Sequence, residues 1–217
     1  MIEITIRDGL GARITTLANA MSTGQEVAFG WDSNEHLPLP HEVVFPRGIA
    51  GVSFVPPMGD GGFTDWNAKP YFSWDGAAER AAANTAYATI LAAMAGVAER
   101  PCKVGICARF FRNPHALPLP LAVAAVKAAH RVGAREVFLL ADSCRWALRC
   151  HLSEHGIETR YPAAFPLTSD LARDEEDTLA FLGDWKTLLA CQTIVAINGP
   201  SCLLNPARAA GRNIIYA

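Results

Sequence analysis

Three apolar runs in the second half of the chain share one pattern. The runs lie within 103–109, 136–143 and 193–201, and each ends abruptly on polar residues or glycine. A short apolar run bounded by turn residues is typical of a strand that is buried on both faces. Ligands of open parallel sheets bind outside the carboxyl ends of the strands. The polar residues after the three runs are therefore expected to gather in one crevice. They are Arg109, Asp142, Ser143, Asn198 and Ser201.

Helical spacing of apolar residues separates these runs. Strands are predicted at 103–108, 136–141, 157–161, 193–197 and 213–216, and helices at 119–132, 143–155, 175–191 and 202–210. Strands and helices that alternate in this way predict a parallel, doubly wound sheet and an α/β fold.

The first half opens as strand, turn, helix and strand, which are predicted at 2–6, 7–11, 12–21 and 26–29. Residues 34–75 are rich in proline, glycine and aromatic residues, with short strands expected at 43–45 and 51–55. A long irregular segment of this kind either carries function or wraps the core. An alanine-rich helix is predicted at 77–98, so two domains are expected, 1–98 and 99–217.

Composition narrows the class of protein. The net charge of −2 argues against a nucleic-acid partner. The first strand lacks the features of a signal peptide, and the apolar stretch 91–98 is too short to span a bilayer. The six cysteines form no CxxC pair, which argues against a zinc site. We therefore expect a cytoplasmic protein with reduced cysteines. A short first half with exposed apolar loop residues would suit a homodimer.

Candidate chemistry in the first half centres on the turn from Asp8 to Gly11. Backbone amides at the N-terminus of the following helix can bind an anion or a sugar hydroxyl. Alternatively, the glycines of this turn serve its geometry alone. The carboxylate of Asp8 is placed at a strand end, where it could act as a general base, and Asp32 after the second strand is the next candidate.

Candidate chemistry in the second half follows the three apolar runs. Arg109 comes directly at a strand end, and its guanidinium matches the geometry of phosphate oxygens, although a plain surface arginine is the alternative. Asp142 and Ser143 can cap a helix or accept hydrogen bonds from a nucleoside. Gly199 permits close approach of a ligand, and Ser201 lies where a helix is predicted to begin, which suits either a phosphate or a helix cap.

The order of these motifs resembles the α1,6-fucosyltransferase and protein O-fucosyltransferase superfamily, and most nearly the bacterial nodulation fucosyltransferases. The segments that carry the resemblance are 8–20, 29–33, 104–109, 137–143 and 184–208. Each motif is weak alone, and their order and spacing supply the signal. The chain departs from the family at Cys107, where the first motif has a histidine, and in its short first half.

The resemblance implies a GT-B fold of two Rossmann-like parallel-sheet halves with a reduced N-terminal half. The first half would bind the acceptor, and the second would bind GDP-fucose as the nucleotide-sugar donor. Arg109 would hold the β-phosphate, Asp142 would contact the nucleoside and Ser201 would contact phosphate. The rest of the expected donor site is Asn113, Ser143 and Gly199, and the expected acceptor-side residues are Gly9, Gly11, Trp31 and Asp32.

The function predicted from the residues and the resemblance together is a glycosyltransferase that needs no metal or other cofactor. It would transfer fucose with inversion to a glycan or small acceptor, with Asp8 and Arg109 as catalytic residues. Cys107 and the short first half favour an alternative, a catalytically inactive nucleotide-sugar-binding protein of the same fold. An unrelated α/β hydrolase or reductase is disfavoured because G-x-S-x-G and a full G-x-G-x-x-G are absent.

Overall fold

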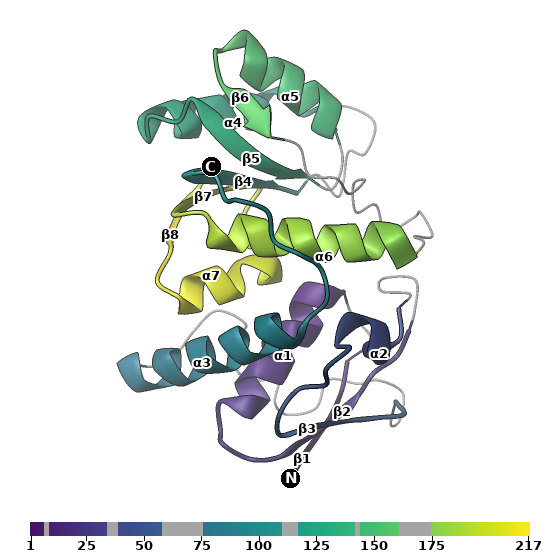
Figure 1. The fold of residues 1–217 in the computed structure, drawn as a ribbon. Coiled ribbons are helices and arrows are strands. Elements are labelled where there is room, and N and C mark those ends of the chain that lie inside the picture. Colours follow the sequence, from purple (N-terminus) through teal and green to yellow (C-terminus); the bar gives the residue numbers. More distant parts are fainter. Residues whose placement is uncertain (7–8, 34–38, 58–75, 110–116, 142–143, 161–174) are drawn as a thin grey trace. The chain divides into compact units, whose positions relative to one another are not determined.

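The computed structural model describes every residue except 7–8, 34–38, 58–75, 110–116, 142–143 and 161–174 (Figure 1). The chain divides into two compact units. Unit 1 comprises Met1–Ala95 and Cys202–Ala210, and unit 2 comprises Gly96–Ser201 and Gly211–Ala217. The domain boundary predicted from the sequence lies between residues 98 and 99, which assigns residues 202–210 to the second half. In the structure, residues 202–210 pack with unit 1.

Unit 1 is built on a small parallel sheet with the strand order β1-β2-β3. Its elements are β1 (Ile2–Thr5), α1 (Leu10–Met21), β2 (Val27–Gly30), α2 (His41–Val44), β3 (Val52–Val55), α3 (Ala77–Ala93), the 3-10 turn η2 (Cys202–Leu204) and α7 (Asn205–Ala209). Strand β2 lies in the middle, where all four of its residues are buried. The predicted opening of strand, helix and strand is confirmed.

The strand predicted at 43–45 is wrong, because these residues belong to the short helix α2 and its end. The carbonyl oxygen of Pro40 accepts hydrogen bonds from the backbone N–H groups of Val43 (3.1 Å) and Val44 (3.3 Å). Proline before a helix has a backbone φ that suits this start. The turn that Pro40 begins therefore outweighs the strand preference of two adjacent valines.

Unit 2 is a five-stranded parallel sheet with the order β6-β5-β4-β7-β8. Its elements are β4 (Val104–Ala108), α4 (Leu119–Arg131), β5 (Glu136–Ala141), α5 (Arg145–Glu154), β6 (Glu158–Arg160), α6 (Glu175–Ala190), β7 (Thr193–Ile197) and β8 (Asn213–Tyr216). These elements confirm the predicted alternation of strands and helices.

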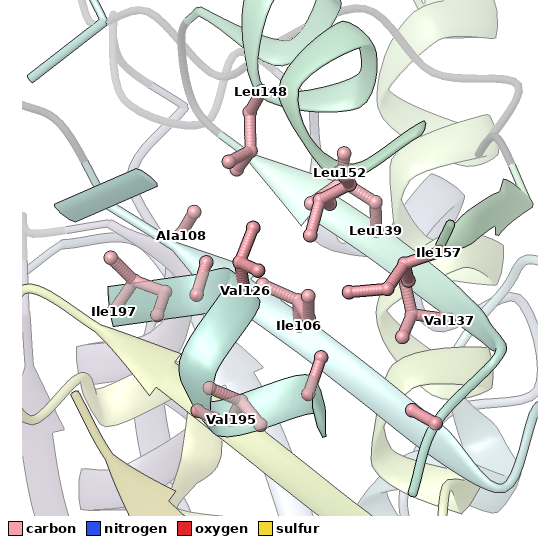
Figure 2. Packing of buried hydrophobic residues seen from close by; sticks show 14 of the residues in the cluster. Ile106, Ala108, Val126, Val137, Leu139, Leu148, Leu152, Ile157, Val195 and Ile197 are labelled. Atoms are coloured by element: carbon pink, nitrogen blue, oxygen red, sulfur yellow. The ribbon is translucent and has the colours of Figure 1, made fainter. Parts of the chain in front are cut away.

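The core of unit 2 follows the alternation of side chains along its strands. Figure 2 shows Val126 of α4 and Leu148 and Leu152 of α5 clustered with Ile106 and Leu139 of the sheet. The other face of β4 packs against α6, since a Cβ atom on Gly105 would lie 2.7 Å from Cδ1 of Leu188. Helices thus cover both faces of the sheet, as a doubly wound fold requires.

The helix predicted at 77–98 ends earlier, at Ala93. The residues that follow are held by other contacts. The backbone N–H of Ala95 donates to the carbonyl of Val44 (2.7 Å) within unit 1. Within unit 2, Lys186 donates to the carbonyl of Gly96 (3.0 Å) and the backbone N–H of Glu99 donates to Thr187 (2.8 Å). These tertiary hydrogen bonds stabilise an extended path that alanine content alone does not predict.

Across the described ranges, no helix has both the length and the apolar character that a bilayer crossing needs.

Candidate functional site

The candidate site of unit 2 is built at the carboxyl ends of β4 and β7. These strands are paired in register, with Ala108 opposite Ile197. The backbone N–H of Arg109 donates to the carbonyl of Ile197 (3.4 Å), and the Asn198 carboxamide donates to the carbonyl of Arg109 (2.7 Å). The structure therefore brings Arg109 and Asn198 together, as the pattern of apolar runs predicted.

The turn from Asn198 to Ser201 has an unusual backbone. Asn198 and Gly199 both have positive φ, at 70° and 91°. A Cβ atom on Gly199 would meet nothing within 4 Å, so its backbone conformation, rather than crowding, calls for glycine. The backbone N–H of Asn198 donates to the carbonyl of Ala217 (3.2 Å), which ties the turn to the residue after β8. Successive backbone amides in such a turn can form an anion-binding concavity.

The single helix predicted at 202–210 is wrong in its start. Cys202–Leu204 form a 3-10 turn, and the α-helix begins only at Asn205. Proline is tolerated in the first turn of an α-helix but not in its interior. Pro206 therefore limits where α7 can begin. The half-buried Ser201 thus precedes a 3-10 turn rather than the N-terminus of a long helix.

Several residues of the predicted site lie outside the described residues. They are Asp8, Asn113, Asp142 and Ser143. Asp142 and Ser143 directly follow β5, whose last residue Ala141 is paired with Ala108 of β4.

The glycines of the first turn have different surroundings. Gly9 is the N-cap of α1, and its carbonyl accepts hydrogen bonds from the backbone N–H groups of Ala12 (3.1 Å) and Arg13 (3.2 Å). A Cβ atom on Gly9 would meet nothing within 4 Å, whereas one on Gly11 would lie 2.9 Å from the backbone nitrogen of Leu203. Gly11 therefore has a packing role, and Gly9 is the glycine with free space beside it.

Trp31 and Asp32 follow the central strand of unit 1. The Trp31 side chain is buried, its Nε1 donates to the carbonyl of Leu39 (2.8 Å), and its ring packs edge-on against Phe45 and Phe54. The structure thus gives Trp31 a packing role. The half-buried Asp32 has its carbonyl oxygen bound by a guanidinium, as described next.

Arg13 is a residue that the sequence analysis missed. Its side chain is 0% exposed, one guanidinium nitrogen donates to the carbonyl of Asp32 (2.6 Å), and its Cζ lies 4.9 Å from the ring centroid of Trp31. The guanidinium therefore joins the first turn of α1 to the segment after β2. The sequence did contain a signal for this residue. At helical spacing Arg13 lies on the same face as Leu10 and Leu17, where apolar residues are expected.

The buried thiol Cys107 lies inside β4, between Leu140 of β5 and Ala196 of β7. Within the part of the chain that the structure describes, no group of three or more histidine, cysteine, aspartate or glutamate residues could hold a metal ion. The predicted independence from metals stays a prediction.

Comparisons with known proteins identify the fold. No protein-family model matches the chain, and no curated protein matches its sequence. A structure of the NodZ α-1,6-fucosyltransferase co-crystallised with GDP is similar, with a TM-score of 0.57 and 15% identity over 95% of this chain and 91% of that one. A structure of NodZ from Bradyrhizobium has a TM-score of 0.55 and 16% identity over 95% and 92%. A NodZ structure soaked with GDP-fucose has a TM-score of 0.52 and 15% identity over 96% and 91%.

At these identities the comparisons establish architecture. The predicted α/β, GT-B-like arrangement is confirmed, and the chain has the fold of the NodZ fucosyltransferases.

Proposed function

We propose that this chain is an inverting glycosyltransferase that transfers fucose from GDP-fucose to a glycan or small-molecule acceptor. The proposal rests on the arrangement at the carboxyl ends of β4 and β7. There the side-chain amide of Asn198 donates a hydrogen bond to the carbonyl of Arg109, and Asn198 and Gly199 form a turn with left-handed backbone conformations. A fold shared with NodZ structures containing GDP or soaked with GDP-fucose supports the choice of ligand.

In this proposal the second unit binds the donor. The Arg109 guanidinium donates to the β-phosphate, and Gly199 and Ser201 present the turn to the same diphosphate. Negative charge grows on the diphosphate as the bond to the sugar breaks, so preorganised donors there lower the barrier. Asp142 and Ser143 contact the nucleoside, and Asn113 belongs to the same donor site.

The first unit supplies the acceptor side. Asp8 takes the proton of the attacking hydroxyl, with Asp32 as the second candidate for this base. The backbone at Gly9 has free space beside it and is where an acceptor hydroxyl could approach. No metal or cofactor is needed, because Arg109 supplies the positive charge at the leaving group. Turnover that persists in EDTA would agree with this part of the proposal, and loss of turnover restored by a divalent cation would contradict it.

A second function, binding without turnover, is favoured by Cys107. This buried thiol occupies the position where the resemblance places a histidine. In this case the chain binds GDP-fucose but releases no GDP from it. The cytoplasmic location and the homodimer remain predictions from the sequence.

The first experiment is thermal unfolding with GDP, GDP-fucose, UDP, ADP and NAD. A ligand that binds only the folded state raises the melting temperature by mass action. We expect selective stabilisation by GDP and GDP-fucose. No response to either nucleotide, or a response only to NAD, would overturn the donor assignment.

The matched variants are Arg109→Ala and Arg131→Ala. Arg131 ends α4, whereas Arg109 follows β4 at the candidate site. We expect Arg109→Ala to lose the response to GDP and to keep the fold, and Arg131→Ala to respond as the wild type does. GDP release from GDP-fucose in the presence of a panel of glycan and small-molecule acceptors then separates the transferase from the binding protein, because transfer needs an acceptor hydroxyl.

A further inference from the structure

Two histidines lie one turn apart at the end of α5. The helix runs from Arg145 to Glu154, and His155 is its C-cap. His151 and His155 are at i and i+4, so they lie on the same side of the helix. Their imidazole ring centroids are 4.7 Å apart, and the ring planes meet at 53°. Two imidazoles at this helical spacing can each direct one nitrogen to a shared metal ion.

The proton on the His155 ring is placed by a hydrogen bond. Its Nδ1 lies 2.8 Å from the carbonyl oxygen of His151. A carbonyl oxygen can only accept, so Nδ1 carries the proton and Nε2 of the neutral ring keeps a lone pair. The residue is exposed, and its Nε2 has no hydrogen bond or ion pair among the described residues. This nitrogen is therefore in the state that binds a metal ion.

The His151 ring meets a carboxylate instead of a carbonyl. Oε2 of Glu154 lies 3.9 Å from its Nδ1, which is too far for a hydrogen bond but close enough to favour the proton on this nitrogen. Nε2 of His151 is buried and has no hydrogen-bond partner in the part of the chain that the structure describes. A buried polar atom without a partner costs free energy, and an ion bound at this nitrogen would remove that cost.

The surroundings of the two rings favour a bound cation. A histidine that binds a metal usually directs its other ring nitrogen to a carbonyl or a carboxylate, which fixes the tautomer and the ring orientation. The carbonyl of His151 and the carboxylate of Glu154 lie in these places. The rings also lie at the C-terminal end of a helix, where the macrodipole favours positive charge.

We propose that His151 and His155 form a binding site for a divalent transition-metal ion such as Zn²⁺ or Ni²⁺. Nε2 of each ring binds the ion, and water molecules fill its other coordination positions. Imidazole suits these ions, whereas Mg²⁺ and Ca²⁺ prefer oxygen ligands. Two protein ligands are fewer than the three or four of catalytic and structural zinc sites, so the ion exchanges with solution.

This metal site is separate from the candidate donor site of the same unit. His155 is followed closely by Glu158, which pairs with Glu136 at the start of β5. Arg109 instead follows the last residue of β4. The histidines therefore lie toward the amino ends of the parallel strands, and Arg109 lies at their carboxyl ends. The metal takes no part in the proposed transfer of fucose, and the metal site does not rest on that proposal.

The test is a calorimetric titration of the full chain, without a polyhistidine tag, with Zn²⁺, Ni²⁺ and Mg²⁺ near neutral pH. The variants are His151→Gln and His155→Gln. The control His130→Gln makes the same change at an exposed histidine in the last turn of α4. Each variant should weaken the binding of Zn²⁺ and Ni²⁺ by roughly tenfold or more, because one of two ligands is lost. The control should bind as the wild type does, and Mg²⁺ should not bind.

Nitrogen-15 NMR of the imidazole rings identifies the donor atoms. Zn²⁺ should shift Nε2 of His151 and His155 and leave the His130 ring unchanged. His155 is exposed, so His155→Gln and the NMR spectrum decide the outcome even if the half-buried His151→Gln fails to fold.

Wild-type affinity in His155→Gln, or a Zn²⁺ shift at only one of the two rings or at neither, would overturn the proposal. The ion would then bind elsewhere, for example at a cysteine. The response of the melting temperature to GDP tests the proposed function separately. A chain that binds Zn²⁺ but not GDP would keep the metal site and lose the donor assignment, and the reverse result would do the opposite.

Discussion

The Asn198 side-chain amide donates a 2.7 Å hydrogen bond to the carbonyl oxygen of Arg109. Asn198 also adopts a φ of 70°, a region that asparagine tolerates better than most residues with a Cβ atom. One side chain therefore supplies both the local turn after β7 and a link to the residue after β4. The backbone of Arg109, the residue proposed to bind phosphate, is therefore fixed in place by the side chain of Asn198.

Replacing Asn198 separates these two contributions. Asn198→Ala loses the hydrogen bond and strains the backbone, so we expect a loss of about 2 kcal/mol in the free energy of unfolding. Asn198→Gly loses only the hydrogen bond and should cost about 1 kcal/mol. Urea unfolding measures both values. Equal destabilisation in the two variants would mean that the left-handed conformation at position 198 causes no measurable strain in alanine.

Arg13 gives a second prediction, because its buried guanidinium binds the Asp32 carbonyl and lies over Trp31. Arg13→Met fills most of the same volume but leaves that carbonyl without this donor. We expect the free energy of unfolding to fall by about 2 kcal/mol, since hydrogen bonds to charged groups are stronger than neutral ones.

The matched control for Arg13 is Arg47→Met, the same substitution at an exposed position of unit 1. It should change the free energy of unfolding by no more than about 0.5 kcal/mol. Wild-type stability in Arg13→Met would show instead that an apolar residue replaces this buried charge without loss, as happens in some proteins.

The strands of unit 2 could be predicted from the sequence because their signal is local. Each apolar run ends on a polar residue, and parallel pairing brings those ends to one edge, which is how Arg109 and Asn198 were found. The placement of 202–210 could not be predicted in this way. The hydrogen bond that helps to decide it joins Asn205 to Thr15, which is 190 positions away in the chain. Helical spacing indicates that a segment has an apolar face, but not which unit will cover that face.

In the candidate site, too, some features follow from local sequence patterns and others depend on residues far apart in the chain. Apolar runs located Arg109, whereas the different roles of Gly9 and Gly11 depend on Leu203, a residue far along the chain. Arg13 was not predicted because the candidate residues were chosen from the polar positions that follow strands. Arg13 is instead a charged residue on the apolar face of a helix.

Gly183 lies inside α6, where replacement of glycine by alanine ordinarily stabilises a helix by about 1 kcal/mol. Here a Cβ atom would lie 2.6 Å from the carbonyl oxygen of Val97. We therefore predict the opposite sign, with Gly183→Ala destabilised by about 1–3 kcal/mol in urea unfolding. Gly76→Ala is the control, because a Cβ atom there meets nothing within 4 Å. A gain in stability for Gly183→Ala would contradict the close packing of the 96–99 segment on α6.

Cys191 makes the stability of unit 2 depend on pH. Burial raises the pKa of its thiol from 9.0 to about 12, and its side chain is 0% exposed. Between these two values the unfolded chain releases the thiol proton while the folded chain keeps it. Unfolding is therefore favoured as the pH rises through this window, by up to about 1.4 kcal/mol per pH unit. Unfolding free energies measured from pH 8 to 11 under reducing conditions should fall less steeply above pH 9 in Cys191→Ala than in the wild type.

The control for Cys191 must be destabilised and must still carry the thiol. Leu188 is fully buried beside it, since Cδ1 of Leu188 and Sγ of Cys191 both lie against Gly105. Leu188→Ala should cost about 2–5 kcal/mol at every pH because it leaves a cavity, but it should keep the wild-type slope above pH 9. Parallel slopes for the wild type and Cys191→Ala would instead assign the alkaline loss of stability to other groups. Cys102 and Tyr87 would then be the next groups to substitute, because burial also raises their pKa values.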